Sequence, residues 1–547
     1  MTSHYGNYDH TKSPLATYIW GHRLRTGQHW IEYMVEFLSV ISGFDYQLGQ
    51  GLKGHPNVKV EYRLPKRLGL RRFIFYDQRE KNRNPYDDHA VQELHKRLSS
   101  RVCGIDSHSD QIAIDQVRSL LRSFSVVEGN RSWYAKTLFP VHEEFLLWEG
   151  QRSRSAKLTT PLLTPDLDLN ELDPDNLDRG MEFTTRNFFA RGGEIYYLIL
   201  SAGTEKQPDY RMFIGKRLRE LLTEHNRILG QIASTIDTTW QPRDNGHTNS
   251  AFITGSLGWI PQRDCALYQQ VAEDLVTFLQ NNLDSLECLE LLAHLIGFHI
   301  ICYIYHHANP HIDRPALIVD LLGAHDGGVL RNQSAASLRE QEDRQLRRAK
   351  DFVTERVREW ATDQLEGPIL LDHLEQETKN YFQLGQTRAK AEYNKTLKEL
   401  GQSYQIERDR ERLLKAYSEG LFKALEGELR KNFLGIHRKI GQAIGLIAPI
   451  KGPKPRFVLG DTLLKTLVMA NLKPDDTLPF GEFLERLYAR YGIIIGPGES
   501  RTAQVMERLR INEEYFSRNR DALRERMRRA GLLIEYSDTT AIVRRVQ

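Results

Sequence analysis

The first long hydrophobic pattern of the chain lies in HWIEYMVEFLSVISGFDY, residues 29–46. Apolar side chains recur there at spacings of three and four residues, which is the period of one face of an α-helix. The pattern predicts an amphipathic helix that ends near Gly43. The apolar positions are Trp30, Tyr33, Met34, Phe37, Leu38 and Ile41.

The segment HPNVKVEYRLPKRLGLRRFIFYD has a different pattern. Its β-branched and aromatic residues cluster at 58–62 and 73–76, which predicts two strands on either side of a basic loop. Helical patterns follow at about 87–100 and 110–124. Together these elements predict a mixed α/β N-terminal domain over residues 1–155.

Residues 156–182 contain many prolines and aspartates and no hydrophobic period, which predicts an acidic linker. A central α+β domain is expected over 183–333. In NFFARGGEIYYLILSAG, the sequence Arg191-Gly192-Gly193 predicts a turn that leads into a buried strand. Further helices are expected at about 211–235, 263–282 and 285–307, with a short strand in RPALIVDLLG.

Residues 334–447 are dense in charge, and acidic and basic side chains alternate at spacings of four residues. This pattern predicts solvent-exposed helices. The heptads are not sustained, so no long coiled coil is expected. IAPIKGPKPR carries a glycine and three prolines, which predicts a second boundary before a C-terminal domain over 456–547.

The last domain has helical patterns near 460–471, 479–490, 501–511 and 519–530, with Asn519 as the expected N-cap of the last helix. Gly531 is expected to end that helix in the left-handed conformation. Two strands, Leu532–Tyr536 and Ala541–Arg545, then flank SDTT. This order is typical of a winged helix-turn-helix. The predicted fold class is therefore α+β, predominantly helical and multidomain, with a C-terminal winged helix-turn-helix-like domain.

Three arginines share one face of that last predicted helix. Arg520, Arg524 and Arg528 repeat at steps of four residues, and like charges at this spacing cost a helix a few tenths of a kcal/mol per pair. A DNA backbone would favour the row because phosphates bind cations and release counterions. We therefore expect these arginines, with Arg544 and Arg545 of the last strand, to contact double-stranded DNA. The alternative is a surface that contacts a protein partner.

A second basic stretch, PKRLGLRRF, carries Lys66, Arg67, Arg71 and Arg72 around a glycine turn, next to aromatic residues. Basic side chains interleaved with aromatics suit a surface that binds backbone phosphates without reading bases. We expect a second DNA contact here. The alternative is a solvated loop whose aromatic residues lie in the core.

Two groups of residues are candidates for a metal site. His299, Cys302 and His306 share a helix face and are of the types that bind zinc, but without paired ligand spacing a packed core helix is the better interpretation. For a metal-dependent nuclease, Asp45, Lys59 and Glu61 lack the usual Glu-x-Lys order, and Asp320 has no obvious partner. No phosphate-loop motif occurs. We expect no catalytic residues, no metal and no cofactor, while the nuclease remains an alternative.

Composition narrows the class of protein further. The net charge is only +3, with 40% hydrophobic and 27% charged residues, so a basic surface must be local. Four cysteines without paired spacing favour reduced thiols and the cytoplasm. The N-terminus does not have the pattern of a signal peptide, and no apolar run is expected to span a membrane. The apolar segment near 288–307 is expected to be a buried helix.

Three stretches, WIEYMVEFLSVISGFDY, NFFARGGEIYYLILSAG and FLERLYARYGIIIG, resemble large uncharacterised proteins of bacterial phage-defence gene clusters. The resemblance covers scattered fragments and no catalytic motif. It implies a non-enzymatic DNA-binding or scaffold subunit of an antiviral defence complex, whose partners would include a separate ATPase or nuclease. A protein-interaction subunit without DNA affinity is the main alternative.

Overall fold

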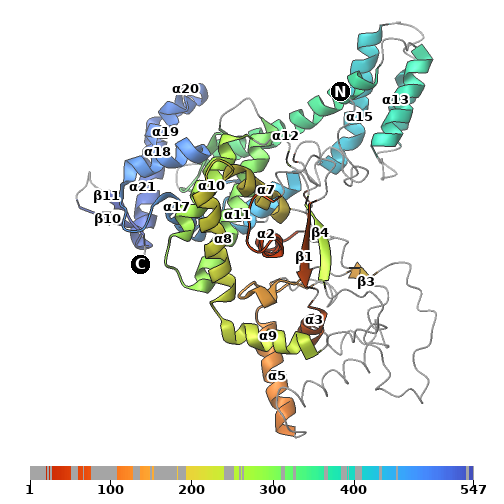
Figure 1. Ribbon diagram of the computed structural model, residues 1–547. Helices are drawn as coiled ribbons and strands as arrows, with labels where there is room; N and C mark the ends of the chain where they lie inside the picture. The colour runs from red at the N-terminus through yellow and green to blue at the C-terminus, as the bar shows by residue number, and fades with distance from the viewer. Residues whose placement is uncertain are drawn as a thin grey trace, which may run out of the picture.

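The protein is predominantly helical, with few and short strands (Figure 1). The computed structural model describes residues 20, 24, 28–50, 60–65, 67–75, 108–126, 136–147, 151–152, 181–182, 192–239, 252–257, 260, 264–309, 314–323, 328–361, 367–382, 391, 393–400, 409–429, 434–450, 454–536 and 541–545.

A central helical body holds most of the core. Helix α2 begins with a capping box in which the Glu32 carboxylate accepts a hydrogen bond from the backbone of His29 at 2.7 Å. It ends at Gly43, as predicted. Helix α2 packs against α7 and α11, and α10 packs against α7, α8 and α11. The bounds are α2 Trp30–Gly43, α7 Gly192–Gly203, α8 Pro208–Thr223, α10 Ala266–Leu279 and α11 Ser285–Ala308.

Helix α7 replaces the strand predicted after Arg191. All of its residues are buried, including Glu194 and Ser201. Its apolar run, residues 195–200, is too short to distinguish a buried strand from a buried helix. The glycines at its start allow a close approach to α2. A Cβ atom on Gly193 would lie 2.4 Å from the backbone nitrogen of Phe37.

The basic stretch after residue 60 contains one strand and one helix. Strand β1 (Glu61–Pro65) pairs antiparallel with β4 (Phe252–Ser256), whereas the second predicted strand is helix α3 (Leu68–Phe75). Leu70, Phe73 and Ile74 are buried in α3 at spacings of three and four residues. This is the hydrophobic period of a helix, whereas the predicted strand would have a period of two residues.

Helices α5 (His108–Arg122) and α9 (Arg227–Thr239) both contact α3. Helix α5 confirms the prediction at 110–124, while the helix predicted at 87–100 lies outside the described residues. The helix predicted at 211–235 is divided into α8 and α9, because Asn226 between them has φ +55°. A short 3-10 helix, η4 (Glu143–Phe145), contacts α9.

The predicted acidic linker lies mostly outside the described residues. Strands β2 (Gln151–Arg152) and β3 (Met181–Glu182) pair antiparallel at its two ends. At the second predicted boundary, β6 (Ile447–Ala448) and β7 (Arg456–Phe457) also pair antiparallel. In both places the chain on one side of the proline-rich segment contacts the chain on the other side.

Helix α11 is long and apolar enough to cross a membrane, contrary to the expectation that no such run exists. Its most apolar window is 94% buried by the rest of the protein. The prediction of a buried helix is therefore confirmed. The role of α11 in this structure is that of the central core helix.

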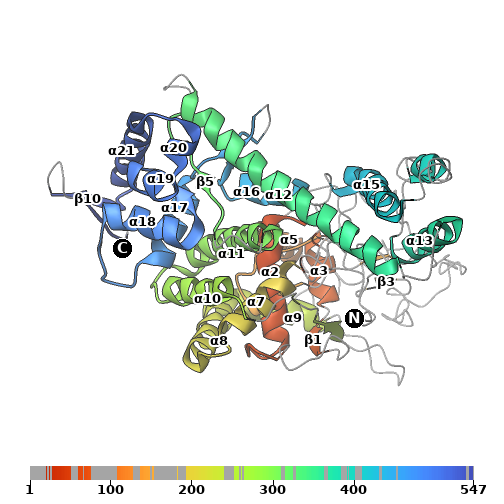
Figure 2. The same ribbon diagram turned by 90° about the horizontal axis from the view of Figure 1, so that it is seen from above.

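A long helix connects the two ends of the molecule. Helix α12 (Val329–Trp360) has 32 residues. Figure 2 shows it running from the C-terminal part towards α13 (Gly367–Tyr381) and α15 (Arg410–Leu429), which form a lateral arm with its far end. Helix α16 (Gly435–Ala443) returns the chain to α11.

The C-terminal unit, defined here as residues 461–545, combines helices with a three-stranded antiparallel sheet of order β10-β11-β8. Helix α17 contacts α10 and α11, and strand β9 pairs parallel with β5 (Leu317–Ile318). The bounds in this unit are α17 Asp461–Asn471, β8 Leu478–Pro479, α18 Phe480–Tyr491, β9 Ile493–Ile494, α19 Pro497–Thr502, α20 Val505–Leu509, α21 Glu513–Arg529, β10 Leu533–Glu535 and β11 Ala541–Val543.

The first two predicted helices, both strands and the turn at Gly531 (φ +71°) are confirmed in this unit. The helix predicted at 501–511 is two short helices, α19 and α20. The cap assigned to Asn519 is wrong, because Asn512 caps α21 by accepting from the backbone of Glu514 at 3.0 Å. Asn519 is instead fully buried inside the helix.

Candidate nucleic-acid interface

Helix α21 has one buried face and one charged face. Its buried residues, Phe516, Asn519, Leu523 and Met527, recur at spacings of three and four. The other face carries most of the charge. The helix contains six arginines against four acids, and the arginines are Arg518, Arg520, Arg524, Arg526, Arg528 and Arg529.

The three arginines predicted to form a row each have a carboxylate partner. Arg520 pairs with Asp521 at 2.9 Å. Arg524 pairs with Glu535 of β10 at 2.7 Å, and its side chain is only 23% exposed. Arg524 therefore connects α21 to the hairpin, whereas Arg520 lies closer to solvent.

Arg528 shares its partner with a neighbouring arginine. Glu525 accepts two hydrogen bonds from Arg528, both at 2.9 Å, and one from Arg529 at 2.8 Å. These charged donors lower the pKa of Glu525 to about 2. Arg528 and Arg529 are 52% and 75% exposed. The sequence contains a signal for Arg529, since it follows Glu525 by four residues.

The two arginines of the last strand face different surroundings. Arg544 is exposed, and its Nε donates to the carbonyl of Gly531 at 3.4 Å. Arg545 is half-buried, and burial lowers its pKa to about 10 despite the opposing charges of Asp476 and Asp475. Arg544 is therefore available at the surface, whereas Arg545 lies near the acids that precede α18.

The second predicted contact is only partly described. Lys66 and the side chain of Arg72 lie outside the described residues. Arg67 pairs with Glu144 at 2.7 Å, and Arg71 is 1% exposed and donates to the carbonyl of Lys136 at 2.9 Å. Both of these arginines are used inside the N-terminal part, so neither presents a bare guanidinium to solvent.

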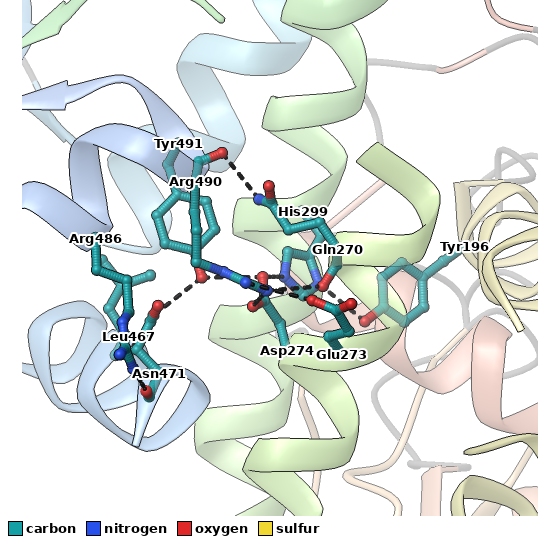
Figure 3. A network of polar contacts seen from close by, with 10 residues as sticks. All are labelled: Tyr196, Gln270, Glu273, Asp274, His299, Leu467, Asn471, Arg486, Arg490 and Tyr491. Atoms are coloured by element: carbon teal, nitrogen blue, oxygen red, sulfur yellow. Dashed lines mark hydrogen bonds and ion pairs between the residues drawn. The ribbon is translucent and has the colours of Figure 1, made fainter. Parts of the chain in front are cut away.

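A buried polar network joins the central body to the C-terminal unit (Figure 3). Asp274 of α10 is fully buried and forms an ion pair with Arg490 of α18. It also accepts hydrogen bonds from the Tyr491 hydroxyl at 2.9 Å and from His299 Nε2 of α11 at 3.2 Å. Sequence reasoning missed this network.

The network continues beyond Asp274 on both sides. Tyr196 of α7 lies 3.0 Å from His299 Nδ1, and Asn471 of α17 donates to the Tyr491 hydroxyl at 3.0 Å. With an ionised Asp274, a neutral His299 that carries its proton on Nε2 satisfies both contacts of the ring, because Nδ1 then accepts from Tyr196. His299 is only 1% exposed, so its environment suits a structural role.

The residues considered for zinc have separate partners. His299 contacts Asp274 and Tyr196, whereas His306 Nε2 lies 3.3 Å from Cys265 Sγ. Cys302 is buried, and burial raises the pKa of its thiol. Within the ranges that the structure describes, no group of three His, Cys, Asp or Glu residues is arranged to hold a metal ion.

The acids considered for a nuclease also have separate surroundings. Asp45 pairs with Arg219 at 2.6 Å on the surface. Asp320 is buried, pairs with Arg456 at 2.6 Å and accepts from the backbone of Leu322 at 3.0 Å. Glu61 is exposed on β1, and Lys59 lies outside the described residues.

Comparison with known proteins adds no identification. No family model, no curated protein and no solved structure matches the chain.

Proposed function

We propose that the protein is a non-enzymatic subunit of a bacterial antiviral defence complex, which contacts the backbone of double-stranded DNA through its C-terminal unit. The observation that carries the proposal is the order of elements around the sheet. The C-terminal unit contains helix α17, strand β8, helices α18 and α21 and the hairpin β10–β11, with sheet order β10-β11-β8. This order supports the assignment of a winged helix-turn-helix. In this assignment α21 is the recognition helix and the hairpin is the wing.

The insertion of α19 and α20 favours contact with the DNA backbone over base reading. It separates α18 from α21, and α19 contacts α21. Arg501 of α19 pairs with Glu513 at the start of α21. In a helix-turn-helix the N-terminal residues of the recognition helix reach the bases. Here the N-terminal end of α21 is acidic, and α19 lies against α21.

The proposed phosphate contacts lie at the other end of α21. Arg528, Arg529 and Arg544 are exposed, and Arg520 adds a further cation at the surface. Exposed ion pairs contribute about 0–1 kcal/mol, so a phosphate can replace the carboxylate partner of each arginine. Arg524 holds α21 against the hairpin through its ion pair with Glu535, and Arg545 is half-buried, so neither belongs to the proposed phosphate contacts.

The cellular context of the proposal rests on the resemblance to phage-defence proteins. The three resembling stretches contain α2, α7 and the segment from α18 to β9. Two of these stretches supply Tyr196, Arg490 and Tyr491 to the buried network. This favours a structural framework that the chain shares with the phage-defence proteins it resembles. A cytoplasmic complex with a separate ATPase or nuclease is the proposed setting.

A protein-only scaffold is the second candidate. It is favoured by the carboxylates that pair with the arginines of α21, and by a net charge of only +3. A surface with balanced charges suits a protein partner with complementary charges.

The two candidates differ in their response to duplex DNA across a salt series. For a DNA contact we expect affinity to fall steeply with salt, and the change of Arg528, Arg529 and Arg544 to alanine to reduce the slope by about 2–3. The matched control changes the exposed Arg347, Arg358 and Arg412 of α12 and α15 to alanine and should bind like the wild type. Absence of binding at low salt would favour the protein-only scaffold.

A further inference from the structure

One carboxylate holds two of the arginines on the proposed DNA-contacting surface. Glu525 sits three and four residues before Arg528 and Arg529 on α21, so all three side chains share one side of the helix. Both oxygens of Glu525 accept from Arg528, and one of them also accepts from Arg529. The remaining arginines of α21 do not share a carboxylate in this way within the described residues.

This arrangement is exposed and therefore exchangeable. The Glu525 side chain is 40% exposed, and its two partners are more exposed still. Charge-assisted hydrogen bonds between guanidinium and carboxylate have the same fork geometry as those between guanidinium and phosphate. A DNA phosphate and Glu525 would therefore compete for the same N–H groups.

We propose that Glu525 is an internal competitor that weakens DNA binding by occupying Arg528 and Arg529. This inference rests on the proposed DNA contact. In the free protein the carboxylate takes the place of a phosphate, and on binding it must give up both arginines. The protein would then hold DNA weakly by itself and firmly only where a partner supplies further contacts.

The test is the variant Glu525→Gln, which removes the negative charge and keeps the shape of the side chain. We expect about tenfold tighter binding to a duplex of random sequence at ~0.1 M salt, and a salt slope steeper by up to about 1.8 for two released arginines. The control is Glu419→Gln on α15, which releases the exposed Lys350 and makes the same change in net charge. Figures 1 and 2 place α15 at the opposite end of the molecule from α21.

Each outcome has a distinct meaning. Tighter binding by Glu525→Gln alone supports the inference. Equal gains in both variants would overturn it, since net charge would then be the cause. If the wild type binds with a steep salt dependence and Glu525→Gln binds equally, the inference fails and the DNA contact stands. If neither protein binds at low salt, both proposals fail.

Discussion

Arg490 of α18 and Asp274 of α10 form a buried ion pair although 216 positions separate them along the chain. Asp274 is fully buried, while the side chain of Arg490 is 24% exposed. The Tyr491 hydroxyl and His299 supply further hydrogen bonds to the same carboxylate. This acid therefore helps to hold the C-terminal unit, through α18, against the central body, together with the packing of α17 on α10 and α11.

Removing this acid should destabilise the whole protein. Asp274→Ala leaves Arg490 without its buried counter-charge, and breaking a buried pair in this way costs roughly 3–5 kcal/mol. The measurement is the free energy of unfolding in denaturant. Asp264→Ala is the matched control, because Asp264 is 78% exposed in its pair with Lys206; it should change stability by less than about 1 kcal/mol. Equal effects of both variants would contradict a structural role for the network.

Two glycine-to-alanine changes should have opposite effects. A Cβ atom on Gly193 would lie 2.6 Å from the backbone oxygen of Tyr33, so α2 and α7 would have to separate. Gly193→Ala should therefore cost at least about 2 kcal/mol. A Cβ atom on Gly481 of α18 meets no atom within 4 Å, so Gly481→Ala should stabilise by about 0.5–1 kcal/mol. Thermal unfolding of both variants checks the contrast, and a loss of stability in both would count against the packing argument.

Stability should fall as the pH drops below neutrality, because His307 is buried in its neutral form. Burial, with His306 and Arg348 nearby, lowers its pKa to about 3. In the unfolded chain the pKa of the histidine ring is about 6.5. The stabilisation is therefore complete above that pH and is lost as the pH falls towards 3, by about 1.4 kcal/mol per pH unit.

The variant His307→Gln isolates this contribution. Glutamine can still form a hydrogen bond with the Tyr268 hydroxyl, which lies 3.0 Å from His307 Nε2, but it does not titrate. Between pH 6.5 and pH 5 the wild type should lose about 2 kcal/mol more unfolding free energy than the variant. Identical pH profiles of the two proteins would show that His307 is not buried as a neutral ring.

Asn519 should be far more important than its position in a charged helix suggests. Its amide donates to the carbonyls of Val319 and Ile495 at 2.9 and 3.0 Å, and its oxygen accepts from the backbone of Leu321 at 2.9 Å. Asn519→Ala leaves these buried groups without a partner and should cost roughly 2–4 kcal/mol.

The N-cap Asn512 offers the comparison, since Asn512→Ala should cost about 1 kcal/mol. Denaturant unfolding of the two variants gives the difference directly. If the two losses are alike, Asn519 does not anchor α21 in solution.

The sequence predicted helices well where one face is apolar or an end has a clear signal. Helices α2, α17 and α18 have such patterns, and Gly531 ends α21 as expected. The segments of helices α3 and α7 were predicted as strands. A short buried run of apolar residues fits the period of a strand as well as that of a helix, so the pattern does not distinguish the two. Local pattern alone does not reveal the close packing of α7 on α2, which decides its conformation.

The candidate site was predictable only in its local part. The arginines of α21 are visible in sequence, and so is the spacing of Glu525 to Arg529. The pairing of Arg524 with Glu535 depends on how the hairpin folds back. The buried network is less visible still, because Tyr196, Asp274 and Arg490 come from three helices that are far apart in the sequence. The best available sign was a charged residue within the apolar segment VAEDLVTFL.

Helix α12 connects two distant surfaces of the molecule. Its 32 residues form a rod about 48 Å long, with contacts to α21, β5 and β7 as well as to α13 and α15. It also contacts α11 of the central body. The lateral arm and the arginine-bearing helix are therefore joined through one continuous helix, and the length of α12 sets how far apart these two surfaces lie.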